Sequence, residues 1–440
     1  MRSNDQETLA HDVCAAVEAL SDDLVDHVAQ AIRIPSVTPT YPGVDYEEHI
    51  GAESRVSRLV EKVLKTAGAE TDVFGAVEGR ENCVGLVRGA GSGRSLILNG
   101  HIDVVPGGAA EEWRHGDPFS GAVADGAVWG RGACDMKGGV VAQAFAALAL
   151  RTAGVKLAGD LLLETVVGEE CMEHTLGTTA CLERGYRADA AVVGEPSAPP
   201  VPLGVVAITP GVTRFIVTIE GRRTHPAMRG MTIHPGTEDP FAIGVNAVDK
   251  AFLIYEALRR REEEWGLTKR HPLFTPGQFV IHPGVVVASP RGQLDPFFIA
   301  DHATLDYIVI HHPDDAIEDV RREVEDVVAT ASHLDGWLRE HPPAVEWKHH
   351  WPPSRVEADH PIVTATCRAH ERATGEAAKV VGWVAVHDGT FLNQGGVPAI
   401  SYGPGDVRRA HAVDEHVPID ELVRACKTYA LLAIDWCSVA

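Results

Sequence analysis

The sequence predicts an α/β protein in which a discontinuous domain with a central, mostly parallel β-sheet is interrupted by an inserted α+β sandwich domain. Helix-like segments alternate with fully apolar strand-like segments as far as Pro210. Strands with alternating apolar and polar residues follow, and the first pattern returns near His360. A chain of 440 residues also exceeds one ordinary core. We therefore predict one domain over 1–210 and 335–440 and a second over 211–334.

The elements of the first domain are predicted from apolar periodicity and from residues that cap or break helices. Ser21 caps an amphipathic helix that Pro35 closes, and a second amphipathic helix over 53–67 ends at Gly68. A helix rich in small residues follows over 138–154. The predicted strands are 82–89, 95–100, 126–132, 157–167 and 188–196, and after the insertion come a helix over 360–374, strands at 379–386 and 397–405 and a final helix from Ile419.

The inserted domain is predicted from strands of a different kind. Residues 212–225 alternate apolar and polar side chains, as in an antiparallel strand with one exposed face. A helix over 246–265, strands at 277–288 and 303–312 and a helix over 315–332 complete a small α+β sandwich.

Composition excludes several classes of partner. The formal charge of −23 disfavours nucleic acid and anionic membranes, because neither attracts a net anion. The eight cysteines are scattered without a CxxC motif, which is typical of reduced thiols in a cytoplasmic protein. The N-terminal residues lack the apolar region of a secretory signal, and no segment has the roughly 20 apolar residues that span a bilayer.

Acidic residues and histidines recur at one kind of place, shortly after an apolar strand. Ligands collect outside the carboxyl ends of strands in an open α/β sheet, so we expect these side chains to lie together. A further acid lies in the loop GRGACDMKGG, before the small-residue helix. The residues are His101, Asp103, Glu169, Glu170, Glu195 and His411 after strands, and Asp135 in the loop.

The charges of this set predict a divalent metal, because close carboxylates repel one another unless a cation neutralises them. Nitrogen and oxygen ligands without thiolates suit zinc, manganese or cobalt. Five ligands with one bridging carboxylate fit two ions roughly 3.5–4 Å apart, which would activate a water and polarise a carbonyl. The five predicted ligands are His101, Asp135, Glu170, Glu195 and His411.

Two acids of the set are left for other roles. Asp103 is predicted to accept the second ring N–H of His101 and so to fix the ligating tautomer. Glu169 is predicted to move the proton of the attacking water to a leaving amine. A serine hydrolase is disfavoured because no GxSxG elbow occurs, and a nucleotide site because no suitably spaced lysine follows a glycine loop.

The motifs resemble one metallopeptidase family, that of acetylornithine deacetylase, succinyl-diaminopimelate desuccinylase, aminoacylase and glutamate carboxypeptidase. The matching stretches are GHIDVVPGG, DPFSGAVADGAVWGRGACDMKGG, GEE at 168–170, VVGEPS and YGPGDVRRAHAVDEHVPIDEL. The resemblance implies that His101, Asp135 and Glu195 bind one metal ion. It implies that Asp135, Glu170 and His411 bind another, with Glu169 as general base and Asp103 behind the ligands.

The resemblance also implies that the inserted domain is a lid that forms a homodimer or higher homo-oligomer. His225, in EGRRTHPAMRG, would then reach the partner subunit's active site and stabilise the oxyanion. Two features depart from the family. The positions where a lid arginine usually binds a substrate carboxylate are Ile308 and Ile310, so Arg222, Arg223, Arg229 or Arg291 would have to substitute. A usual Thr-Asp pair is replaced by His387-Asp388-Gly389-Thr390, of which His387 and Asp388 are candidate substrate contacts.

The sequence therefore predicts a hydrolase that cleaves an amide C–N bond in a small carboxylate-bearing molecule, such as an N-acyl amino acid. An aminohydrolase acting on an activated aromatic or amidine carbon and a dipeptidase or carboxypeptidase remain alternatives. A non-catalytic binding protein is disfavoured, because every candidate ligand is present.

Overall fold

The apolar strands of the first predicted domain pair in one sheet, whose central strands are buried on both faces. The computed structural model describes residues 3–197, 201–234, 236 and 238–440. The sheet has eight strands in the order β1-β2-β6-β3-β7-β14-β8-β13. Their bounds are β1 (Glu70–Phe74), β2 (Asn82–Val87), β3 (Leu96–His101), β6 (Leu161–Val166), β7 (Ala190–Val193), β8 (Val205–Ile208), β13 (Val380–Gly382) and β14 (Ala399–Ser401).

The middle of this sheet is parallel. β3 pairs in parallel with β6 and with β7, and β14 pairs in parallel with β7, whereas β1 and β2 are antiparallel at one side. Four neighbouring strands, β6, β3, β7 and β14, thus end at the same edge. The predicted fold class, a mostly parallel central sheet with a separate antiparallel insertion, is confirmed.

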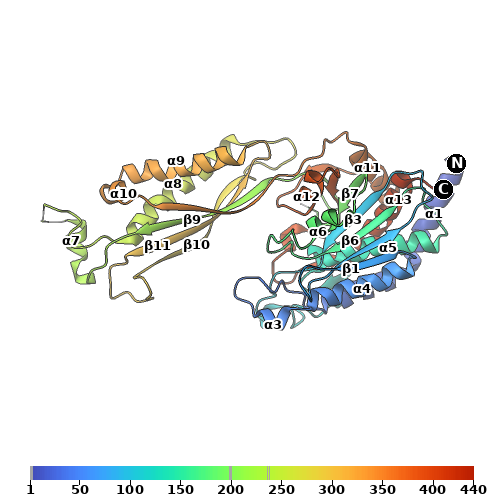
Figure 1. Cartoon of the computed structure of the whole chain (residues 1–440), viewed down its shortest axis with the longest axis horizontal. Coiled ribbons are helices and arrows are strands. Elements are labelled where there is room, and N and C mark those ends of the chain that lie inside the picture. Colours follow the sequence, from blue (N-terminus) through green and yellow to red (C-terminus); the bar gives the residue numbers. More distant parts are fainter. Residues whose placement is uncertain (1–2, 198–200, 235, 237) are drawn as a thin grey trace. The chain divides into compact units, whose positions relative to one another are not determined.

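Helices cover both faces of the sheet (Figure 1). α4 packs on β2, α5 and α13 pack on β3, and α6 and α12 pack on the opposite face, against β6 and β7. Around this sheet, the helices with eight residues or more are α1 (Ser3–Ala19), α2 (Ser21–Ile32), α4 (Ala52–Thr66), α5 (Gly138–Thr152), α11 (Pro361–Thr374) and α13 (Ile419–Cys437). The shorter elements are α3 (Tyr46–His49), α6 (Thr178–Glu183), α12 (Gly389–Gln394), η1 (Ala110–Glu112), η2 (Ala133–Lys137) and η4 (Val407–Arg409).

The segment Ala133–Thr152, which includes α5, is long and apolar enough to cross a membrane by length and composition alone, but 89% of the tested window is buried inside the protein. We therefore assign α5 to the core. No other helix in the described part of the chain passes the same test.

The predicted strand at 126–132 lies outside the main sheet. It forms β5 (Ala127–Trp129), which pairs with β4 (Ala122–Ala124) and β15 (His416–Pro418) in a three-stranded antiparallel sheet. This small sheet joins the segment before Asp135 to the segment after His411.

The chain divides into two units. The first runs to Thr209 and resumes over Ser354–Trp383 and His387–Ala440, and the second comprises Pro210–Pro353 and Val384–Val386. The second unit holds an antiparallel sheet in the order β10-β11-β9-β12, with α8 and α9 packed together beside it. Its elements are β9 (Gly211–Glu220), β10 (Val280–Ser289), β11 (His302–His311), β12 (Ala344–Trp351), η3 (Pro226–Met228), α7 (Arg229–Ile233), α8 (Ala247–Thr268), α9 (Ile317–His333) and α10 (Gly336–Glu340). Because β12 pairs with β9, this unit extends beyond the predicted limit at 334.

Candidate metal centre

The parallel strands bring the predicted ligands to one edge of the sheet. His101 is the last residue of β3, Glu170 follows β6, Glu195 follows β7 and His411 follows β14. Asp135 reaches the same place from η2, at the start of α5. Gly139 permits this approach, because a Cβ there would lie 2.0 Å from the carbonyl oxygen of Gly194.

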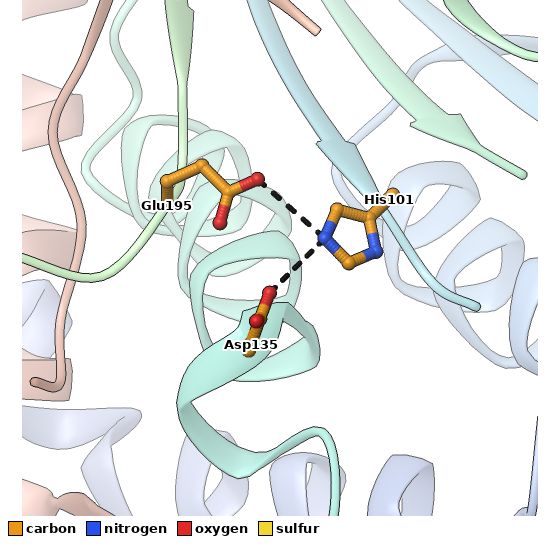
Figure 2. A group of neighbouring side chains, drawn as sticks. All are labelled: His101, Asp135 and Glu195. Carbon is orange, nitrogen blue, oxygen red and sulfur yellow. Dashed lines mark hydrogen bonds and ion pairs between the residues drawn. The ribbon is translucent and has the colours of Figure 1, made fainter. Parts of the chain in front are cut away.

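The first group of candidate ligands is His101, Asp135 and Glu195 (Figure 2). The Nε2 atom of His101 lies 3.2 Å from Asp135 Oδ1 and 3.5 Å from Glu195 Oε1. The other ring nitrogen, Nδ1, lies 3.0 Å from the backbone carbonyl oxygen of Asp103, to which it donates as N–H. This hydrogen bond leaves Nε2 as the atom that faces the two carboxylates.

The second group is Asp135, Glu170 and His411. His411 Nε2 lies 2.9 Å from Glu170 Oε2 and 3.4 Å from Asp135 Oδ2. Asp135 therefore offers one carboxylate oxygen to each group, as a bridging ligand would. His411 is the exposed member of the set, with 55% of its side chain accessible, so this half of the centre faces solvent.

The electrostatics of the two groups call for a cation. Burial and the nearby Asp135 carboxylate raise the pKa of Glu195 to about 7, and the same two causes raise the pKa of Glu170. Burial would lower the pKa of His411, but Glu170 and Asp135 raise it to about 11. Without a metal, protons held by Glu195, Glu170 and His411 would therefore balance part of the charge, whereas His101 and His411 lower the pKa of Asp135 against the effect of burial.

Unpartnered buried oxygen atoms also fit a metal. Glu170 Oε1 and Glu195 Oε2 are buried and have no hydrogen-bond partner among the described residues. Buried carboxylate oxygens are expensive to leave unpaired, and coordination to an ion would satisfy them. The donor set of imidazole nitrogens and carboxylate oxygens thus suits a divalent transition metal.

Glu169 lies beside the two groups without belonging to either. Its Oε2 atom is 3.9 Å from His101 Nε2, and 12% of its side chain is accessible. Burial raises the pKa of Glu169 well above its ordinary range, opposed by the charge of His101. A carboxyl group at this position could accept a proton from a molecule held between the ligands and return it.

Asp103 does not act as predicted on His101. Its Oδ1 atom is 3.7 Å from His101 Nδ1, which is too long for a hydrogen bond. The carboxylate instead accepts the backbone N–H groups of Gly168 at 2.9 Å and Glu170 at 3.1 Å, and the hydroxyl of Thr38 at 2.9 Å. Asp103 therefore fixes the loop that carries Glu169 and Glu170.

The two candidate substrate contacts lie in the interior. His387 is 1% exposed and Asp388 2% exposed, and both follow Trp383 in the first unit. Burial lowers the pKa of His387 to about 3 and raises the pKa of Asp388 to about 7. The Nδ1 atom of His387 accepts the backbone N–H of Gly389 at 3.0 Å. Neither side chain is presented to solvent in this conformation.

The second unit holds the remaining predicted residues. His225 is exposed, and its Nδ1 accepts the backbone N–H of Ala227 at 3.1 Å, which leaves Nε2 as the donor. All four arginines considered as substitutes for the lid arginine already have partners in their own unit. Arg223 pairs with Asp301, Arg229 with Asp249, Arg291 with Glu220, and Arg222 donates to the carbonyl oxygen of Phe241 and stacks on Trp337.

The sequence prediction missed the buried ion pairs behind the site. Arg80 pairs with Glu53 at 2.6 Å and with Glu173 at 2.6 Å, and Glu173 lies in the loop that carries Glu169. Arg131 pairs with Glu415 at 2.5 Å behind Asp135. The only sequence signal was proximity, since Glu173 and Glu415 each lie four residues or fewer after a candidate site residue.

A comparison with family models identifies the chain. The model described as peptidase family M20/M25/M40 matches residues 97–435. The chain belongs to this family. The metallopeptidase family indicated by the motifs is thereby confirmed, and this M20/M25/M40 member is a metallohydrolase that acts on C–N bonds.

Two relatives cover almost the whole chain. N-formyl-4-amino-5-aminomethyl-2-methylpyrimidine deformylase from Halalkalibacterium halodurans is 33% identical, over 98% of this chain and 97% of the relative. The protein of the same name from Bacillus subtilis is 33% identical, over 96% of this chain and 98% of the relative. Among solved structures, the dipeptidase Dug1p from Saccharomyces cerevisiae has a TM-score of 0.74 at 14% identity, over 97% of this chain and 98% of that chain. That likeness shows that the two chains share a fold.

Proposed function

We propose that this protein is a metal-dependent deformylase that hydrolyses the amide bond of a small N-formylated amine carried on a heteroaromatic ring. The observation that carries the proposal is the pair of ligand groups sharing Asp135, with Glu169 beside them. The names of the two full-length relatives supply the substrate class.

The substrate class also agrees with the missing lid arginine. Ile308 and Ile310 cannot bind a carboxylate, and Arg223, Arg229 and Arg291 are already paired with acids. An N-acyl amino acid would bring a carboxylate, for which none of the arginines considered in the described part of the second unit is left without a partner. An N-formylated aminomethylpyrimidine brings no such charge, so we favour it over an N-acyl amino acid or a peptide.

Each residue of the candidate site has a proposed role in the hydrolysis. His101, Asp135 and Glu195 would hold one divalent ion, and Asp135, Glu170 and His411 a second. When bound, zinc, manganese or cobalt would polarise the formyl carbonyl and lower the pKa of a water. Glu169 accepts the proton of the attacking water and returns it to the departing amine as the C–N bond breaks, which yields formate and a free amine. Asp103 keeps Glu169 in place through the backbone of its loop.

We propose further that the second unit forms a homodimer. β10 is an edge strand with β11 as its one neighbour, and three consecutive side chains on it, Val285, Val286 and Val287, are 52%, 49% and 44% exposed. An apolar exposed edge is a site for pairing with another chain. His225, exposed on the same unit, would then stabilise the oxyanion in the partner's active site. Free cysteines throughout agree with a cytoplasmic location.

The proposal is tested with the purified chain loaded with zinc, manganese or cobalt. The panel contains N-formyl-4-amino-5-aminomethyl-2-methylpyrimidine, N-acetyl and N-succinyl amino acids, dipeptides and free aminopyrimidines, with formate, amine and ammonia measured as products. We expect the largest kcat/KM for the formylated pyrimidine, with formate released. A larger kcat/KM for a dipeptide or an N-acyl amino acid would overturn the deformylase assignment, and ammonia release would indicate an aminohydrolase.

A further inference from the structure

Glu415 is a fully buried carboxylate directly behind the candidate metal centre. Its Oε1 atom accepts the backbone N–H groups of Cys134 and Asp135, each at 3.1 Å. Its Oε2 atom accepts from Arg131 at 2.5 Å, and Arg131 is itself 3% exposed. Every strong contact of this side chain is therefore made to the segment that leads into Asp135.

The backbone of Glu415 belongs to the other side of the centre. It lies in the segment between His411 and β15, and its carbonyl oxygen accepts the N–H of Gly130 at 2.8 Å. The next residue, His416, pairs with Trp129 in the small sheet. The Glu415 residue thus connects the segment that carries His411 to the segment that carries Asp135 through both its backbone and its side chain.

The position of Asp135 depends on this connection. The Asp135 carboxylate lies 3.2 Å from His101 on one side and 3.4 Å from His411 on the other, so it is shared by both ligand groups. Fixing its backbone N–H fixes the point from which that carboxylate projects. Loss of an outer partner of a metal ligand lowers metal affinity, typically by about 10- to 100-fold.

We propose that Glu415 is a positioning residue that sets the separation of Asp135 and His411, and through it the affinity of the second ligand group for its metal ion. This inference rests on the metal centre of the proposed function, but not on the substrate. Glu415 is connected to the two groups to different extents. In the first group only the shared Asp135 contacts Glu415, since His101 and Glu195 have no contact with it among the described interactions. In the second group Asp135 contacts Glu415 and His411 lies in the same segment as Glu415, so we expect the larger effect there.

The chain offers a matched control in Asp335. Its Oδ1 atom accepts the backbone N–H groups of Trp337 and Leu338, each at 3.0 Å, and its Oδ2 atom accepts from Lys250 at 2.6 Å. Like Glu415, this carboxylate accepts from two backbone N–H groups and one cationic side chain, but it lies in the second unit and contacts no candidate ligand among the described interactions. Glu415→Gln and Asp335→Asn therefore remove equivalent charges, one near the centre and one away from it.

The test uses the full chain, stripped of metal with a chelator and titrated with Mn²⁺ or Zn²⁺ by calorimetry, with Tm measured before metal is added. We expect Glu415→Gln and Glu415→Ala to weaken one of the two binding steps by about tenfold or more and to change the other step by less than about threefold. We expect kcat to fall while KM for the formylated pyrimidine stays within about threefold. Asp335→Asn should lower Tm and leave both binding steps unchanged.

Two outcomes overturn the inference. One is a Glu415→Gln variant whose two metal affinities both equal those of the wild type, whatever its Tm. The other is an equal weakening of both steps. If the wild type shows two metal-binding steps, of which only one depends on Glu415, but no deformylation, the substrate assignment fails and the inference on Glu415 stands. If Glu415→Ala does not fold, the isosteric Glu415→Gln still gives the comparison.

Discussion

The backbone N–H of Glu170 donates to the carboxylate of Asp103 at 3.1 Å, and this contact determines how the candidate base loop is held. The same carboxylate accepts the N–H of Gly168 at 2.9 Å, while the imidazole of His101 is held by the backbone carbonyl of Asp103. One buried residue thus positions a candidate ligand through its main chain and a loop through its side chain. Asp103 is fully buried, so no water replaces these contacts.

Asp103→Asn should reduce both stability and turnover. The amide has one oxygen acceptor in place of two, so its NH₂ group must face a backbone N–H or the Thr38 hydroxyl. A buried donor left without an acceptor costs about 1–3 kcal/mol in the free energy of unfolding. Urea denaturation and kcat measure the two effects. Asp189→Asn is the control, because that carboxylate accepts from Ser95 on the surface; equal losses in both variants would contradict the role of Asp103.

Glu169→Gln should abolish proton transfer while leaving the ligands in place. The amide cannot accept the proton of the attacking water, and general-base catalysis contributes about 10²- to 10⁴-fold. We expect kcat to fall within that range with metal content unchanged, measured by steady-state kinetics and elemental analysis. Turnover within about tenfold of the wild type would show that another group is the base.

Metal removal should inactivate the protein and destabilise it more at high pH. Burial raises the pKa of Glu195 to about 7, above its value in the unfolded chain. Without metal, the protonated Glu195 carboxyl therefore contributes to the free energy of unfolding at low pH, and this contribution is lost as pH rises through the folded pKa. A bound ion replaces the proton and adds about 4 kcal/mol when free metal exceeds its Kd by about 1,000-fold. Calorimetry with and without chelator at about pH 5 and about pH 8 checks this. A metal effect on Tm that is smaller at the higher pH would contradict it.

His311 should make the second unit sensitive to acid. Its ring is fully buried and lies over Gly211 in the neighbouring strand β9. This burial lowers the pKa of His311 to about 4. Because the unfolded chain binds this proton more readily, stability is lost as pH falls from the ordinary histidine range toward 4, by up to about 3 kcal/mol. His311→Phe should remove that part of the pH dependence in urea denaturation. His333→Phe, at an exposed position that ends α9, should leave it unchanged.

Val286→Asp should shift the protein toward monomers. The side chain is 49% exposed on the edge strand β10, so a charge there costs the folded monomer little but opposes pairing of two apolar edges. We expect the dimer Kd to rise by about tenfold or more, measured by light scattering over a dilution series. Leu267→Asp, 76% exposed in α8 of the same unit, should leave the Kd unchanged. A wild type that is already monomeric would refute the dimer.

The sequence could predict the elements and the edge of the sheet where the candidate ligands meet, because both follow from local periodicity. Leu96 to Leu98 is a continuous apolar run, which is the pattern of a parallel strand buried on both faces, and the polar residues that follow indicate where the strand ends. The partners of a strand depend on distant residues. Ala127–Trp129 therefore had the pattern of a main-sheet strand but pairs with β15 in a separate sheet. β12 was missed because a register shift between Trp347 and His350 interrupts its alternation.

Side-chain directions past the end of a strand could not be predicted. The expected contact between Asp103 and His101 extends the two-residue period of β3 beyond its last paired residue, His101. There the chain leaves the sheet, and the Asp103 carboxylate turns to the loop after β6. The same holds for Glu415, whose carboxylate accepts from the backbone N–H groups of Cys134 and Asp135, which lie far away in sequence. The direction of neither carboxylate can be read from a single sequence.

The order β6-β3-β7-β14 has a consequence for how such proteins diverge. Neighbouring strands in any sheet are held about 4.8 Å apart by their backbone hydrogen bonds, whatever their side chains. His101 ends β3, and Glu170, Glu195 and His411 lie in the segments after β6, β7 and β14, so the strand order fixes the order in which these segments leave the sheet. Replacement of loops that carry none of these residues can therefore change which molecule is accepted without altering that order. Hydrogen exchange should accordingly be slowest in β3, the strand between the two acid-bearing neighbours, in any descendant that keeps the centre.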